Sequence, residues 1–221
     1  MKLAMQALIK YLCGLILVGV LLFWPAGGFD YPNGWLFLIL LFVPMLILGI
    51  VLLIRSPELL GKRLGVKEKE STQKGVVAAA GLLFVCGFVV AGLDHRFGWS
   101  RLPLGVVIAA SAVLLISYGL YAEVMRENAY LSRTVEVQKG QRVIDSGLYG
   151  IVRHPMYAAT VGLFLSIPLV LGSLPALACF APYVIVIAIR IRSEERVLEQ
   201  GLEGYADYKK RVKYRLIPFL W

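Results

Sequence analysis

Five stretches of the chain contain no Asp, Glu, Lys or Arg, and their lengths limit what it can fold into. The stretches are residues 11–29, 31–54, 75–93, 102–122 and 154–189. A helix needs roughly 20 apolar residues to cross a bilayer, so each of the first four is long enough for one spanning helix. The fifth, at 36 residues, is too long for one helix and slightly short for two full spans and a turn.

The fifth stretch contains one natural break, at Gly172-Ser173 followed by Pro175. It predicts a short helix near 155–171 and a second helix from about 175, which continues past Arg190 out of the membrane. The chain is thus expected to be all-α, a polytopic membrane bundle of about six hydrophobic helices with a cytoplasmic cap from its C-terminal half. The first stretch has the alternative of a signal peptide, but no clean cleavage site follows it, which favours a retained helix.

Charge is scarce and very unevenly placed along the chain. Charged residues make up 17% of the sequence and hydrophobic residues 59%, whereas soluble domains have about 25% charged residues. This excludes a soluble or disordered class. With six spans, 21 of the 23 Lys and Arg residues fall on one side, so both termini are expected in the cytoplasm and the protein is multi-pass. Topology and anionic membrane lipids explain the net charge of +9, and no nucleic-acid partner is needed.

The segment between the second and third stretches, residues 55–74, mixes leucines with many charges. It is predicted to contain a short amphipathic helix in the membrane interface. Residues 1–122 are then the N-terminal transmembrane part, and residues 123–221 carry the candidate chemistry. Within the latter, 123–157 and 190–221 are polar and rich in Arg, Tyr and Glu, enough for a small cap over the bundle.

The first candidate motif is Arg153-His154-Pro155-Met156-Tyr157. Proline suits the first turn of a helix, so His154 stands near the N-cap, where unpaired N–H groups favour a carboxylate or phosphate. The alternative is structural: Arg153 reaches lipid phosphate and His154 only caps the helix.

The second candidate is the pair Arg190 and Glu194, which share a helix face at the membrane border. Ionisable groups at such depth are costly and tend to be functional. The alternative is an ordinary ion pair on a solvated helix, with Arg192, Glu195, Arg196 and Glu199 on its other faces. The three cysteines and two histidines lie far apart, so no disulfide framework or metal site is expected.

Together these motifs strongly resemble the isoprenylcysteine carboxyl methyltransferase family, whose relatives include phospholipid N-methyltransferases. The resemblance rests on VIDSGLYGIVRHPMY (143–157), RIRSEERVL (190–198), YADYKKRV (205–212) and Pro218, and covers roughly residues 120–221. It implies an integral-membrane methyltransferase that uses S-adenosyl-L-methionine, with residues 123–221 as the methyltransferase core. The spans that eukaryotic members have in addition are absent here, which counts against a prenylated-protein substrate.

The resemblance also implies a set of site residues. By position, the cofactor pocket would be lined by Gln138, Gln141, Arg142, Val143, Ile144, Tyr149, His154, Pro155, Met156, Tyr157 and Glu194. The helix start and His154 would suit the cofactor carboxylate, the tyrosines would supply hydroxyls or ring faces, and Glu194 would face its cationic groups. Arg190 and Glu194 are the expected catalytic residues, and no metal is required.

The expected function is methyl transfer from S-adenosyl-L-methionine to a small lipophilic acceptor at the cytoplasmic face. An isoprenylcysteine-like carboxylate, a thiol and a lipid amine stay open as acceptors, and the acceptor is expected to enter from the bilayer. The alternatives are a non-enzymatic transporter or binding protein, which the scarcity of polar residues in the spans disfavours, and an inactive relative of the family.

Overall fold

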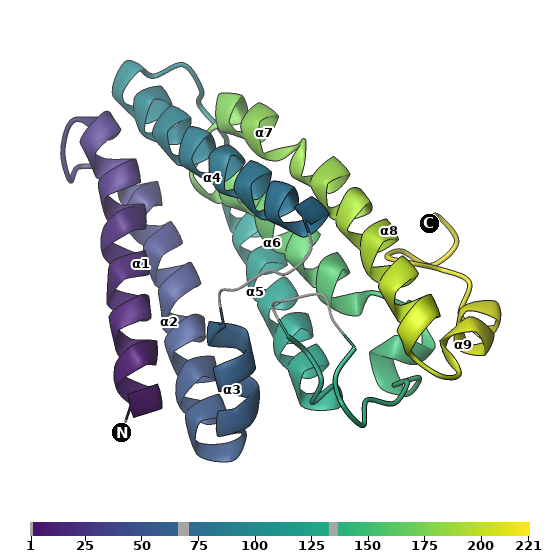
Figure 1. Ribbon diagram of the computed structural model, residues 1–221. Coiled ribbons are helices and arrows are strands. Elements are labelled where there is room, and N and C mark those ends of the chain that lie inside the picture. The colour runs from purple at the N-terminus through teal and green to yellow at the C-terminus, as the bar shows by residue number, and fades with distance from the viewer. Residues whose placement is uncertain (1, 66–70, 133–136) are drawn as a thin grey trace.

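The computed structural model describes residues 2–65, 71–132 and 137–221, and within these ranges the regular structure is entirely helical. The elements are α1 (Lys2–Ala26), α2 (Pro32–Arg55), α3 (Pro57–Leu64), α4 (Ser71–Phe97), α5 (Leu104–Glu127), the 3₁₀ turn η1 (Gly147–Gly150), α6 (Pro155–Val170), α7 (Leu174–Phe180), α8 (Tyr183–Gly201) and α9 (Tyr205–Arg211). Figure 1 shows α1 and α2 at one edge of the bundle and α9 at the other.

The predicted helical membrane bundle is confirmed. Five segments are long and apolar enough to span a membrane: α1, α2, residues 74–97 of α4, α5, and the stretch 174–201 that joins α7 and α8. The sixth apolar helix, α6, has only 16 residues. At 1.5 Å per residue it is about 24 Å long, less than the roughly 30 Å hydrocarbon core.

The hairpin falls where the sequence placed it, because α6 ends at Val170 and α7 begins at Leu174. Ser173 caps α7 by accepting a hydrogen bond from the Ala176 N–H at 3.1 Å. The second arm is not one continuous helix, as expected, but breaks between Phe180 and Tyr183. Pro182 lies in this break, and it has no N–H to donate to the preceding turn.

Close packing of small residues holds the spans together. A Cβ added to Gly92 in α4 would lie 2.5 Å from the carbonyl oxygen of Leu22 in α1, and one added to Gly162 in α6 would lie 2.4 Å from the Ser117 hydroxyl in α5. Only glycine allows such approaches, as is common between membrane helices. Many large apolar side chains on the spans are exposed, such as Ile54 at 74% and Leu104 at 72%, which suits a lipid-facing surface.

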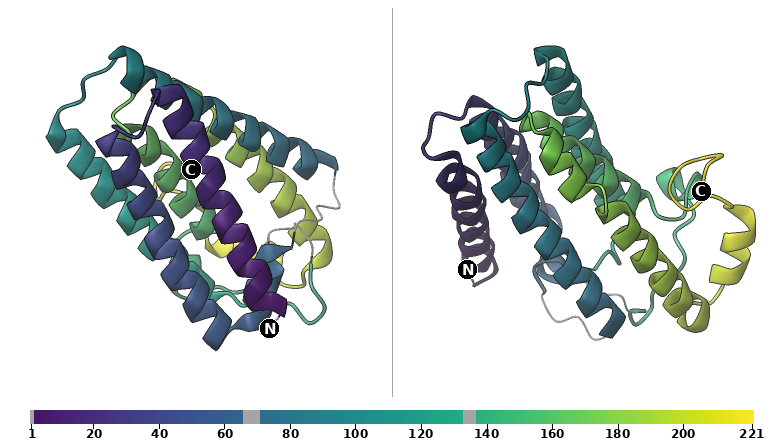
Figure 2. Two further views of the ribbon diagram at one scale, coloured as in Figure 1. Left: turned by 90° about the vertical axis from the view of Figure 1, so that its left-hand side faces the viewer. Right: turned by 90° about the horizontal axis from the view of Figure 1, so that it is seen from above.

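The segment between α2 and α4 contains the predicted amphipathic helix. It is α3, whose Leu59 and Leu60 are buried while the exposed Glu58 pairs with the partly buried Lys62 at 2.9 Å. Of the rest of the expected segment, residues 66–70 lie outside the described residues and residues 71–74 begin α4. The right-hand view in Figure 2 shows α9 and the C-terminal tail gathered beside the bundle rather than between its helices.

Candidate active site

The start of α6 is held by the chain's last residues. The Arg153 N–H donates to the Tyr214 carbonyl and the His154 N–H donates to the Arg215 carbonyl, both at 2.9 Å. Pro155 then begins α6, as the sequence predicted. The tail therefore fixes the position of the motif that the sequence singled out.

Beneath this contact lies a buried carboxylate, Glu195, which is 3% exposed. Its Oε1 accepts from Arg153 Nε at 2.8 Å and lies 3.2 Å from His154 Nε2, while its Oε2 accepts from Arg215 Nε at 3.0 Å and Nη2 at 2.9 Å. Arg153 also donates to the carbonyls of Val212 and Lys213. Glu195 thus ties α6, α8 and the tail together.

The sequence placed Glu195 only on another face of the helix from Arg190 and Glu194 and gave it no role, whereas the structure buries it. Adjacent residues on a helix point about 100° apart, so Glu194 and Glu195 face different surroundings. The packing of residues 212–215 against α8 decides which surroundings these are, and that packing is not visible in the local pattern. His154 faces Glu195 through Nε2, and Arg153 is buried rather than directed to lipid.

Arg190 and Glu194 meet at the hydroxyl of Tyr157. Arg190 Nε donates to the Tyr157 oxygen at 2.8 Å, and this hydroxyl donates to Glu194 Oε2. The Arg190 guanidinium also lies 5.9 Å from the centre of the Tyr157 ring. A residue of the first turn of α6 therefore joins two residues of α8 into a chain of hydrogen bonds.

This chain of hydrogen bonds lies on the wall of a cavity of about 100 Å³, here called the polar cavity. The expected residues that line it are Gln141, Arg142, Val143, Ile144, Tyr149, His154, Met156, Tyr157, Arg190 and Glu194. Gln138 and Pro155 are not among its lining residues. Gln138 instead donates its backbone N–H to Gln141 Oε1 at 2.8 Å and its side chain to the Tyr130 carbonyl.

Several residues of the polar cavity were not predicted. They include Asn128, Tyr130, Tyr205 and Tyr208. Tyr205 is 4% exposed, and its hydroxyl has no hydrogen-bond partner among the described residues. An unpaired buried hydroxyl is costly, so this wall lacks a polar group that a ligand can supply. The Tyr-x-x-Tyr spacing at 205–208 was a signal in the sequence that could have pointed to these two cavity residues, but the spacing does not indicate what either ring does.

Burial keeps the tyrosines of this wall protonated. It raises the pKa of Tyr205, with the carboxylates of Glu195 and Glu194 adding to the effect. Burial also raises the pKa values of Tyr149 and Tyr208. Asn128 donates to the Tyr149 hydroxyl at 2.9 Å, and Tyr208 donates to the Tyr149 carbonyl at 2.8 Å. These hydroxyls are therefore neutral near pH 7, and those of Tyr149 and Tyr205 still have a hydrogen to donate, whereas that of Tyr208 is already engaged.

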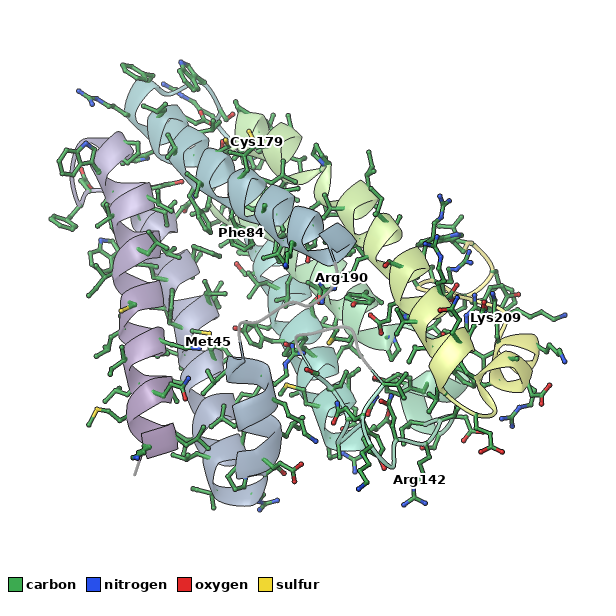
Figure 3. The ribbon with its side chains drawn as sticks, in the orientation of Figure 1. Met45, Phe84, Arg142, Cys179, Arg190 and Lys209 are labelled. Carbon is green, nitrogen blue, oxygen red and sulfur yellow. The ribbon has the colours of Figure 1, made fainter. Side chains whose placement is uncertain are left out.

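A second cavity, of about 610 Å³, adjoins the first and is here called the apolar cavity. Residues of α2, α3, α4, α5, α6 and α8 line it, and three of them, Met45, Phe84 and Arg190, are labelled in Figure 3. It shares Ser132, Met156, Tyr157 and Arg190 with the polar cavity. The two spaces meet at the pair Arg190 and Tyr157.

Arg63, which the sequence did not single out, also lines the apolar cavity. Its Nη1 donates to the Ser132 carbonyl at 3.2 Å and lies 3.6 Å from Met156 Sδ, and its Nη2 donates to the Tyr121 hydroxyl. The interfacial helix α3 therefore brings a second guanidinium toward the boundary between the cavities. The sequence gave no sign of this, because the contact joins residues 58 to 93 positions apart.

Comparison with known proteins shows which families and proteins this chain resembles. Residues 101–203 match the family model described as phospholipid methyltransferase. The mouse Delta(14)-sterol reductase TM7SF2 is 33% identical over 95 residues, which is 40% of this chain and 22% of that protein. The chain thus spans about a fifth of the curated relative that it matches.

One solved structure can be aligned with nearly the whole of this chain. It is the eukaryotic intramembrane Ras methyltransferase, isoprenylcysteine carboxyl methyltransferase, with 13% identity, 98% of this chain and 85% of that chain covered, and a TM-score of 0.49. The family model includes both Arg153–Tyr157 and Arg190–Leu198. The family model therefore confirms the resemblance to phospholipid methyltransferases over residues 101–203 of this chain.

Proposed function

We propose that the protein is an integral-membrane methyltransferase that uses S-adenosyl-L-methionine to methylate a lipophilic acceptor. The observation that carries the proposal is the meeting of two unlike cavities at Tyr157 and Arg190. One is polar and lined by the cap, and the other is apolar and lies among the spans. This arrangement suits a water-soluble cofactor on one side and a membrane-borne acceptor on the other.

The residues of the polar cavity fit the cofactor's chemistry. When bound, S-adenosyl-L-methionine supplies an electrophilic methyl group on a sulfonium, together with an ammonium, a carboxylate and an adenine. Glu194 is a carboxylate for the cationic groups, Arg142 is a guanidinium for the carboxylate, and Tyr205 has an unpaired hydroxyl. His154 faces Glu195, so it contributes mainly by holding the start of α6.

The polar cavity must widen to hold such a ligand. Its volume of about 100 Å³ is below the roughly 300–1,000 Å³ typical of small-molecule sites. Residues 141–144 of its wall belong to neither a helix nor a strand, whereas Tyr157, Arg190 and Glu194 stand on helices. The loop wall is thus the part that moves, and the helical wall keeps the reacting groups in place.

Arg190 and Tyr157 would orient the acceptor where the cavities meet. Methyl transfer is an in-line displacement, so holding the nucleophile in line with the methyl group supplies much of the rate. Arg63 and Arg190 both line the acceptor side. Their positive charge favours an anionic nucleophile, such as a carboxylate, over a protonated lipid amine.

Arg190 and Glu194 are the proposed catalytic residues, and each has a separate role. Arg190 presents a planar fork of donors to the acceptor, which the single point charge of lysine does not reproduce. Glu194 accepts from Tyr157 and would take up a proton through this hydroxyl when the nucleophile is neutral.

The central experiment is calorimetric titration of S-adenosyl-L-methionine into the purified protein in detergent. Binding is expected, and Glu194→Gln should weaken it about 10- to 100-fold, the equivalent of losing a hydrogen bond to a charged group. Glu199→Gln is the control, because Glu199 is half-exposed and pairs only with Lys209 among the described residues. Absence of binding to the wild type would refute the proposal.

The sterol reductase relative supplies the rival function, since 95 residues here are similar to an enzyme of reduction. A reductase needs a hydride donor, so NADPH is titrated under the same conditions. Binding of NADPH without S-adenosyl-L-methionine would replace the proposed function. Radiolabelled methyl transfer to a prenylated cysteine and to phosphatidylethanolamine then separates a carboxylate acceptor from an amine.

A further inference from the structure

A third cavity lies at the end of the bundle away from the cap. The loops between α1 and α2, α4 and α5, and α6 and α7 enclose about 370 Å³ there, and the first two of these loops lie at the upper end in Figure 1. Its lining residues include Tyr31, Asn33, Asp94, His95 and Arg101. It shares no lining residue with the polar or the apolar cavity.

A buried polar group of this cavity is the carboxylate of Asp94, a residue only 2% exposed. Its Oδ1 accepts from the Ser100 N–H at 2.7 Å. Its Oδ2 is shielded from solvent and has no hydrogen-bond partner among the described residues. A buried carboxylate oxygen without a donor is unfavourable, so this wall lacks a hydrogen-bond donor.

Two of the neighbouring donors, Tyr31 and His95, are engaged elsewhere. The Tyr31 hydroxyl donates to the Leu171 carbonyl at 2.7 Å, and His95 Nε2 lies 2.6 Å from the Asp30 carbonyl. The His95 and Tyr31 rings stack with their centres 4.2 Å apart and form a flat wall. Arg101 is exposed and makes no hydrogen bond or ion pair within the described ranges. The cavity thus combines an inner negative charge with a positive charge at an outer residue.

We propose that this cavity binds a primary ammonium group that is attached to an anionic group. The ammonium would donate to Asp94 Oδ2, and the anion would lie against Arg101. A quaternary ammonium has no N–H and so cannot supply the missing hydrogen bond. The source of this chemistry is either the headgroup of an aminophospholipid or a free aminoalkyl phosphate.

The surroundings favour the lipid as the source. Asp94 lies near the end of the span 74–97, and Arg101 lies just before the next span, which begins at Leu104. Phe97 and Trp99 are exposed beside them, with ring centres 5.7 Å apart. Exposed aromatic rings at the end of a span are typical of the headgroup level of a membrane.

The test is native mass spectrometry of the protein reconstituted with equal amounts of phosphatidylethanolamine and phosphatidylcholine. The wild type should retain phosphatidylethanolamine at least about tenfold over phosphatidylcholine, since one strong charge-assisted hydrogen bond distinguishes them. Asp94→Asn should abolish the preference, whereas Arg101→Gln should lower the retention of both lipids, because both carry the phosphate that would lie against Arg101. Asp30→Asn is the control, because Asp30 is exposed at the same end and offers His95 only its backbone carbonyl.

Other outcomes assign the ligand differently. Equal retention of the two lipids by the wild type, together with no effect of O-phosphoethanolamine on its melting temperature, overturns the proposal, as does an unchanged preference in Asp94→Asn. Loss of the preference in Arg190→Lys alone would place the lipid in the apolar cavity and also overturn it. If O-phosphoethanolamine in detergent raises the melting temperature of the wild type but not of Asp94→Asn, while the lipid preference is absent, the ligand is the free aminoalkyl phosphate.

Discussion

The two ends of the bundle each bury a carboxylate, and they treat it in opposite ways. At the cap, both oxygens of Glu195 are bound by Arg153, His154 and Arg215. At the other end, Asp94 receives one backbone donor, and its second oxygen has none among the described residues. Both residues are at most 3% exposed.

The difference separates a structural charge from one that is open to a ligand. Burying a charge is tolerated when charged partners and hydrogen bonds surround it, and then removing one member is costly. A carboxylate with an unbound oxygen keeps part of its desolvation cost, and a ligand that supplies the donor recovers that cost. The same reasoning applies to Tyr205, whose unpaired hydroxyl lies on the polar cavity.

The first prediction concerns which compartment each end faces, and its outcome is all-or-none. We expect both termini in the cytoplasm, because 21 of the 23 Lys and Arg residues fall on that side of a six-helix topology. A C-terminal alkaline phosphatase fusion, active only outside the cytoplasm, should show no activity, and a C-terminal fluorescent protein should fold. Phosphatase activity would invert the assignment of the two ends.

The second prediction is that Glu195→Gln destabilises the cap strongly. The change leaves the buried Arg153 without its anionic partner, and breaking a buried ion pair in this way costs about 3–5 kcal/mol. Thermal unfolding in detergent and trypsin cleavage at Lys209–Arg211 measure it. Glu199→Gln removes only the half-exposed pair with Lys209 and should cost at most about 1 kcal/mol. Equal effects of the two changes would mean that the buried network does not hold the cap.

The third prediction is that Tyr205→Phe weakens cofactor binding without loss of stability. The hydroxyl has no partner among the described residues, so its removal costs the free protein no hydrogen bond. Loss of one hydrogen bond to the ligand, about 0.5–1.5 kcal/mol, lowers affinity about 2- to 10-fold. Calorimetry and melting temperature are measured on the same sample. Tyr208→Phe is the contrast, because it removes the bond to the Tyr149 carbonyl and should lower stability.

The fourth prediction concerns the smallest change in stability, and the sign of that change distinguishes Asp94 from Glu195. Asp94→Asn keeps an oxygen for the Ser100 N–H and removes a buried charge, so in detergent without lipid the protein should be unchanged or more stable by about 1 kcal/mol. Thermal unfolding measures the change. A loss comparable to that of Glu195→Gln would show that Asp94 is as structural as Glu195.

The sequence predicted the bundle well because spans are determined locally. Hydrophobic length located the five long apolar spans, and Pro155 and Gly172-Ser173 predicted the limits of α6 to within a residue or two. The break at Pro182 was missed, because it lies within an uninterrupted apolar run. Hydrophobicity indicates where a span lies, but it does not show where a proline removes a backbone hydrogen bond.

Most of the expected site residues line one cavity, but the supporting contacts were beyond local reasoning. Glu195 is bound by residues 20, 41 and 42 positions away, and the partner on the tail, Arg215, belongs to no motif. Arg63 reaches the cavity boundary from a helix whose surface pattern predicted only membrane contact. Such contacts depend on how the tail and α3 pack, which helix periodicity does not specify.

The shortness of α6 has a consequence for the depth at which a lipid would reach Tyr157. The helix is about 24 Å long and the hydrocarbon layer is roughly 30 Å thick. When Val170, at the C-terminal end of α6, is placed at the membrane boundary away from the cap, Pro155 lies about 6 Å inside the boundary on the cap side. Tyr157, in the first turn of α6, would then stand at the depth of acyl carbons. Lifting a hydrocarbon chain into water costs about 0.8 kcal/mol per methylene, or about 8 kcal/mol for ten. Under the proposed function, a lipid acceptor that meets Tyr157 at this depth would keep its chain in the bilayer, and the water-soluble methyl donor would have to enter to reach it.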